Sequence, residues 1–113
     1  METTDAEVHS LRLASAAMGD GGTPSFMAEC FWPDVREELV EEAAARVQRG
    51  VDDLSRRGMP ITFVGTILVP EDETVFYLFE RASAETVREA CERAAIPVGR
   101  VVRSVPRRAP GVA

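Results

Sequence analysis

Two stretches of the chain, residues 61–69 (ITFVGTILV) and 75–81 (VFYLFER), are apolar at nearly every position. A strand with one face in water alternates apolar and polar residues, whereas a strand that is covered on both faces does not. The segment PEDET between them has the length and composition of a hairpin connection. The sequence therefore predicts a hairpin with two covered faces. Any fold proposed for this chain must bury both faces of this hairpin against other parts of the protein or against a second molecule.

A third strand is expected at residues 25–32 (SFMAECFW), a short aromatic-rich run between Pro24 and Pro33. A long helix should follow, capped by Asp34 and stopped near Arg57 by a glycine and a proline. Its apolar residues fall at helical spacing and form one stripe. The stripe consists of Val35, Leu39, Ala43, Val47, Val51 and Leu54.

Residues 83–97 (SAETVREACERAAIP) predict a second helix, capped by Ser83 and ended by Pro97, and residues 98–105 (VGRVVRSV) predict the last strand. The order β-α-β-β-α-β is that of the ferredoxin-like α+β fold. Right-handed crossovers place both helices on one face of a four-stranded antiparallel sheet. A second copy of the chain would then cover the other face, so we expect a homodimer of the dimeric α+β barrel type.

The two ends are expected to be flexible, a leader at 1–24 and a tail at 106–113, on either side of a ferredoxin-like domain at 25–105. GDGGTP at 19–24 has the composition of a hinge. Before the hinge, Val8, Leu11, Ser15 and Met18 could line one side of a short helix.

Composition excludes several classes of partner. The chain has 113 residues and a net charge of −6, and an acidic surface does not suit nucleic acid. It has no apolar run of membrane-spanning length and no signal-peptide pattern, which predicts a cytoplasmic protein without a membrane partner. The two cysteines, Cys30 and Cys91, are expected to be free buried thiols, since Cys91 lies on the apolar side of its helix.

The segments FMAECFWP and VFYLFERASAETVREACERAAIPVGRVV, with their element order, resemble a family of small bacterial ferredoxin-like proteins whose studied representative is a nickel-binding dimer. The resemblance covers residues 26–105. The residues that match the family pattern are Glu29, Pro33, Arg88, Glu89 and Pro97.

At the positions of metal ligands this chain departs from the family. Tyr77 stands where the family has a cysteine, and Ala90 stands where it has a histidine. The stretch FVGTI at 63–67 stands where the family has a polar run, and within it only Thr66 retains a hydroxyl. The one histidine, His9, lies in the leader. The resemblance therefore implies a degenerate metal site: nickel is a possible cofactor, and no other is expected.

Glu29 is the foremost candidate residue, because a carboxylate on a covered strand is costly unless it is paired or hydrated. It would act as a general base or bind a ligand, or else form an ion pair with an arginine such as Arg81 or Arg100, or make a dimer contact. Tyr77 would donate a hydrogen bond to a ligand or simply pack in the core. The expected ligand-binding set is Glu29, Trp32, Phe63, Thr66 and Tyr77.

Three functions follow from these residues. The first is a module, binding or regulatory, that takes a small apolar molecule. The second is a cofactor-independent barrel enzyme (an oxygenase, isomerase or cyclase) acting on an aromatic or polyketide-like substrate, with Glu29 as base and Tyr77 as hydrogen-bond donor. The third is nickel binding, for which His9 would be recruited from the leader with Glu29 and, as a further candidate, a cysteine thiol.

Overall fold

The computed structural model describes residues 25–111. The predictions made for residues 1–24 and for the last two residues lie outside this range. The elements follow the order β1 (Ser25–Phe31), α2 (Glu37–Arg56), β2 (Thr62–Val69), the 3₁₀ turn η1 (Pro70–Asp72), β3 (Thr74–Glu80), α3 (Ala84–Arg93) and β4 (Arg100–Ser104).

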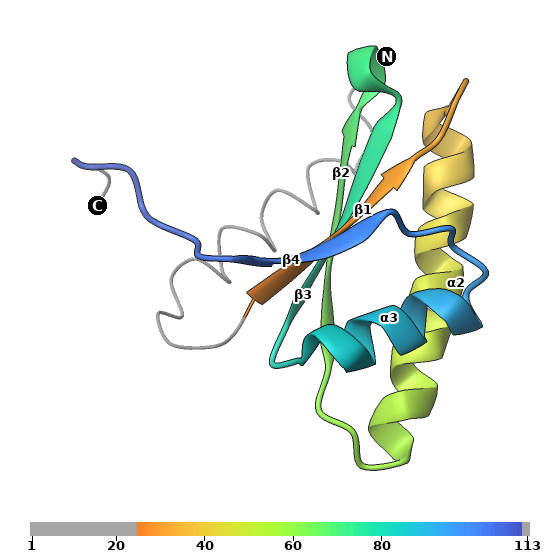
Figure 1. Cartoon of the computed structure of the whole chain (residues 1–113), viewed down its shortest axis with the longest axis vertical. Helices are drawn as coiled ribbons and strands as arrows, with labels where there is room; N and C mark the ends of the chain where they lie inside the picture. The colour runs from red at the N-terminus through yellow and green to blue at the C-terminus, as the bar shows by residue number, and fades with distance from the viewer. Residues whose placement is uncertain (1–24, 112–113) are drawn as a thin grey trace.

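The four strands form one antiparallel sheet in the order β2-β3-β1-β4, and both helices lie on the same side of it (Figure 1). This arrangement confirms the predicted ferredoxin-like α+β fold. No helix in the described part of the chain is long and apolar enough to cross a membrane.

The core lies between the sheet and the helices and takes alternate residues of each strand. The ladders pair Ala28 of β1 with Tyr77 of β3 and with Val101 of β4, and all three contribute to the core. The fully buried side chains of largest volume are Tyr77, Phe79, Leu54, Val47, Val75, Val87, Cys30 and Cys91. The predicted stripe of α2 is confirmed from Ala43 onward. Val40 is buried ahead of it, Val35 packs against the core just before the helix begins, and Leu39 is only half-buried.

The start of α2 differs from the prediction. Its N-cap is Arg36, which caps without a side-chain hydrogen bond, so the prediction that Asp34 caps the helix was wrong. Asp34 instead adopts a left-handed backbone conformation, with φ of 59°, and its N–H donates to the Glu73 carboxylate at 2.8 Å. The Trp32 N–H also donates to the Glu73 carbonyl. These two bonds tie the end of β1 to the β2–β3 hairpin, which the local helix signal could not reveal.

The predicted cap of α3 is confirmed. The Ser83 hydroxyl accepts from the Thr86 N–H, and the Thr86 hydroxyl accepts from the Ser83 N–H, which makes a reciprocal capping box. The helix then packs closely on α2. A Cβ atom added at Gly50 would lie 3.1 Å from the Ala90 carbonyl oxygen, so a glycine allows the two helices to approach.

The other side of the sheet carries no helix from the described part of the chain (Figure 1). We call it the open face. It takes the strand residues that alternate with the core positions, and it includes one register shift in β2 between Phe63 and Gly65. Its members are Ser25, Met27, Glu29, Phe31, Thr62, Ile67, Val69, Thr74, Phe76, Leu78, Glu80, Arg100, Val102 and Ser104.

Candidate functional site

Glu29 lies near the middle of the open face, on a central strand of the sheet. The guanidinium of its cross-strand neighbour Arg100 donates from Nε to Glu29 Oε1 at 2.6 Å. This is one of the two ion pairs that the sequence left open, and it is a charged hydrogen bond on a partly exposed surface. The pair places one carboxylate and one cation next to each other on the sheet.

Apolar side chains surround this pair. Phe76 pairs with Glu29 from the opposite strand, and Ile67 pairs in turn with Phe76. The next row across the sheet consists of Gly65, Leu78, Met27 and Val102. Phe31, at the end of β1, is 63% exposed, and Ile67, in the row of Glu29 and Phe76, is 38% exposed. This part of the open face could make apolar contacts with another molecule, and it carries one ion pair among its apolar side chains.

Tyr77 lies on the opposite side of the sheet. It pairs with Ala28 and Thr66 and is fully buried, and its hydroxyl has no hydrogen-bond partner within residues 25–111. Burial, with the nearby Cys30 and Cys91, raises the pKa of the Tyr77 phenol far above its ordinary value. The phenol therefore stays neutral, and the sheet separates it from Glu29.

The other expected ligand-binding residues, apart from Glu29, lie on the same side of the sheet as Tyr77. Phe63 packs against the core with its ring centroid 6.5 Å from that of Tyr77 and 5.3 Å from that of Phe79. Trp32 is partly buried against the same core, and Thr66 pairs with Tyr77 across the ladder. Of the five expected residues, only Glu29 lies on the open face, so the structure does not bring the set together.

The thiols of Cys30 and Cys91 are free and buried, as predicted. Burial raises the pKa of both, that of Cys91 to about 12, so they remain protonated at neutral pH. Within residues 25–111 there is no group of three or more His, Cys, Asp or Glu side chains that could hold a metal ion. Ala90 is fully buried, and His9 lies outside the described residues.

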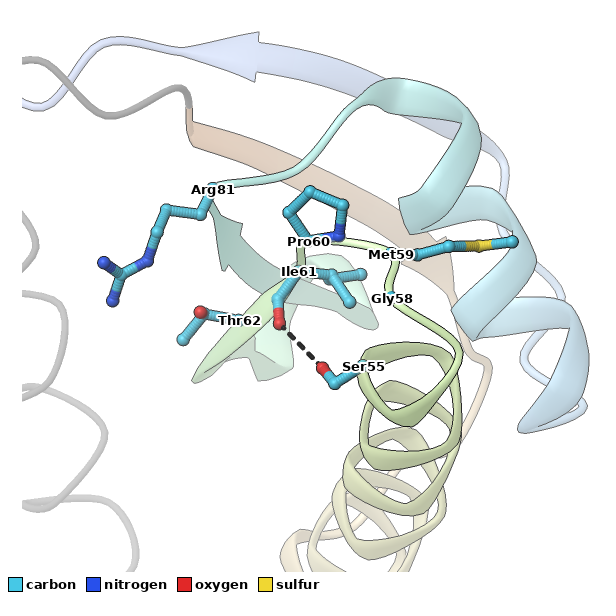
Figure 2. A pocket seen from close by; sticks show the side chains of 7 residues that line it. All are labelled: Ser55, Gly58, Met59, Pro60, Ile61, Thr62 and Arg81. Atoms are coloured by element: carbon cyan, nitrogen blue, oxygen red, sulfur yellow. Dashed lines mark hydrogen bonds between the residues drawn. The ribbon is translucent and has the colours of Figure 1, made fainter.

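A shallow hollow of about 320 Å³ lies away from Glu29, where α2 turns into β2 (Figure 2). Arg81 lies at one side of it and Met59 at the other, and the Ser55 hydroxyl donates to the Ile61 carbonyl within it. The hollow has one cation and no second charged group among the residues that line it. It therefore has fewer charged groups for binding a ligand than the open face has.

Comparison with known proteins supports the fold and no more. No family model matches the sequence, and no curated protein is similar to it. The chain is similar in fold to SCO4226 from Streptomyces coelicolor A3(2). The crystal structure of that protein matches with a TM-score of 0.59 and 21% sequence identity, over 75% of this chain and 99% of SCO4226. About a quarter of this chain thus lies outside the match.

Sequence reasoning missed the apolar neighbours of Glu29 on the adjacent strand, above all Phe76 and Leu78. The alternation of side chains along a strand is the signal that could have found them. In β1 and β3 every second residue fills the core, and the residues between lie on the open face. What the sequence lacked was the register, which decides which residues of β3 share a face with Glu29.

Proposed function

We propose that this protein is a small-molecule-binding module of ferredoxin-like fold, related to the nickel-binding family but without its metal ligands. The ligand site is the part of the open face around Glu29, and a second copy of the chain encloses it. The proposal revises the binding set expected from the sequence. It keeps Glu29 and adds Arg100, Phe76, Met27 and Ile67.

The observation that carries the proposal is an ion pair set into an apolar surface. A carboxylate that is withdrawn from water is costly unless it is paired, and Arg100 provides the partner. Because Arg100 uses only Nε toward Glu29, its remaining N–H groups are available to a polar group of a ligand. Apolar side chains on either side of the pair would hold the body of that ligand.

A second copy is favoured by the apolar residues of β2 and β3. Their core positions are covered by helices, while Ile67, Phe76 and Leu78 face away from the helices. Two open faces packed together would remove these side chains from water. The ion pairs of the two copies would then lie within one enclosed space.

The enzymatic alternative is not favoured by any contact in the described part of the chain. It required Glu29 and Tyr77 to act on one substrate, but the two side chains lie on opposite faces of the sheet. A neutral phenol sealed in the core cannot reach a ligand on the open face. Glu29 alone would have to perform the chemistry.

Titration with 8-anilinonaphthalene-1-sulfonate, an apolar aromatic anion, tests the site. Ile67→Asp introduces a charge on the open face and should weaken dye binding about tenfold, a change of about 1.4 kcal/mol. Met59→Asp is a matched control, because Met59 is 39% exposed and Ile67 is 38% exposed, while Met59 borders the hollow of Figure 2.

Equal dye affinity in Ile67→Asp and the unmodified protein would refute the site. So would an equal loss in both variants, since that would reflect added negative charge and not position. Both side chains are partly exposed, so neither change disrupts the core, and a circular dichroism spectrum checks this directly.

A further inference from the structure

The open face changes in polarity from one edge of the sheet to the other. Its residues lie in rows that cross the strands from β2 to β4. The row through the candidate site consists of Ile67, Phe76, Glu29 and Arg100. The row beside it consists of Gly65, Leu78, Met27 and Val102. The charges of these two rows therefore lie on β1 and β4, while β2 and β3 contribute apolar side chains and a glycine.

Arg100 is the more accessible member of the ion pair. Its side chain is 69% exposed, whereas that of Glu29 is 32% exposed. It is the first residue of β4, which is an edge strand of the described sheet. Among the open-face residues that the structure describes, Arg100 is the only one with a positive charge. A ligand that approaches this edge therefore meets the guanidinium first.

The Arg100 guanidinium has donors that the ion pair does not use. Within residues 25–111 only its Nε makes a hydrogen bond, and that bond goes to Glu29 Oε1. The Nη1 and Nη2 atoms carry parallel N–H groups, and this geometry suits the two oxygens of a carboxylate. An ammonium group would instead have to reach Glu29, the less exposed partner. The pair therefore favours an anionic group over a cationic one.

The apolar strands set the place of the rest of the ligand. Between β4 and β2 lie three strand spacings, a distance of about 14 Å. This distance is close to the length of extended decanoate. A chain that starts at Arg100 and crosses the sheet would pass Met27, Phe76 and Leu78 before it reaches Ile67. Burial of its methylene groups against these side chains would be favourable.

We infer that the ligand of this site is an amphipathic carboxylate. Its carboxylate accepts hydrogen bonds from Nη1 and Nη2 of Arg100, and its apolar body lies across β1, β3 and β2. Glu29 orients the guanidinium through Nε, but its like charge opposes the bound carboxylate. The inference rests on the proposed function and adds the chemical class of the ligand.

Calorimetric titration of the full-length chain with octanoate, octanol and octylammonium tests the head group, because the three compounds share one alkyl chain. Octanoate should bind about tenfold more tightly than octanol, since it gains charged hydrogen bonds. Octylammonium should bind more weakly than either. Decanoate has two more methylene groups than octanoate and should bind roughly tenfold more tightly.

Two substitutions at the ion pair should act in opposite directions. Arg100→Gln removes the cation and should weaken octanoate binding about tenfold. Glu29→Gln removes the opposing charge and frees the guanidinium, so it should tighten octanoate binding. Arg49→Gln is the matched control, because Arg49 is an exposed arginine of α2, on the other side of the sheet. It loses the same charge and should leave octanoate binding unchanged.

The inference is overturned if octylammonium binds most tightly, or if octanoate binds no more tightly than octanol. Equal weakening of octanoate binding in Arg100→Gln and Arg49→Gln would also overturn it, because the effect would then come from net charge. The dye titration judges the site separately. If Ile67→Asp weakens dye binding while octanoate shows no preference over octanol, the site stands and the ligand class is wrong.

Discussion

Three titratable side chains lie together in the buried core between the sheet and the helices: Tyr77, Cys30 and Cys91. Each has a raised pKa, because burial penalises the charged form. All three belong to the core. Their ionisation affects the protein only at a pH high enough to remove their protons.

Stability should therefore fall in alkaline solution. The pKa of Cys91 is about 12 in the folded chain and near 9 in the unfolded chain. Below pH 9 both states hold the proton and the stability is complete. Above pH 9 only the unfolded state loses it, so the free energy of unfolding drops by about 1.4 kcal/mol per pH unit for this thiol.

Urea unfolding between pH 8 and 11, followed by the fluorescence of Trp32 under reducing conditions, measures this slope. Cys91→Ala should reduce the slope of the free energy of unfolding against pH by the contribution of about one proton. The variant will also be less stable at every pH. A slope that is identical in the two proteins would show that the thiol ionises equally well in the folded chain.

At the scale of single elements, the sequence predicted the order and the approximate bounds of every strand and helix within residues 25–105. It failed where a long-range contact overrides a local signal. Asp34 has the residue type of a helix cap, but its N–H is held by Glu73, which is distant in sequence. No local pattern contains that partner.

The placement of the candidate site residues relative to one another was not predicted, for a similar reason. The alternation of side chains within a strand puts Glu29 on the side opposite Ala28 and Cys30, and it puts Tyr77 on the side of Val75 and Phe79, as the structure has them. It could not relate the two strands, because a shift of one residue in register moves a whole strand's side chains to the other face. The register shift near Gly65 adds a second such uncertainty in β2.

The cap of α3 is a feature that was both predicted and confirmed, and it can be measured. Ser83→Ala removes the hydroxyl that accepts from the Thr86 N–H, and it should lower the free energy of unfolding by about 1 kcal/mol. Ser83→Asp keeps an acceptor at the same position and should retain most of the stability. If both variants are equally destabilised, the hydroxyl contributes nothing as a cap.

At the scale of the whole molecule, the proposed dimer depends on the open face. Light scattering over a range of concentrations should give twice the mass of a single chain. Phe31→Glu, at the exposed end of the face, should shift the protein toward the single-chain mass, because a charge there must be buried on association. Met59→Glu is the matched control and should leave the mass unchanged. A single-chain mass at every concentration would refute the dimer while leaving the fold as it is.

The alternation of β1 also bears on how such a protein diverges. Ala28 and Cys30 are fixed by the filled interior, whereas Met27, Glu29 and Phe31 between and beside them contact nothing in that interior. Mutations at these three positions can therefore leave the filled interior unchanged. Chains that keep this interior can therefore differ in the molecules they recognise and still fold alike.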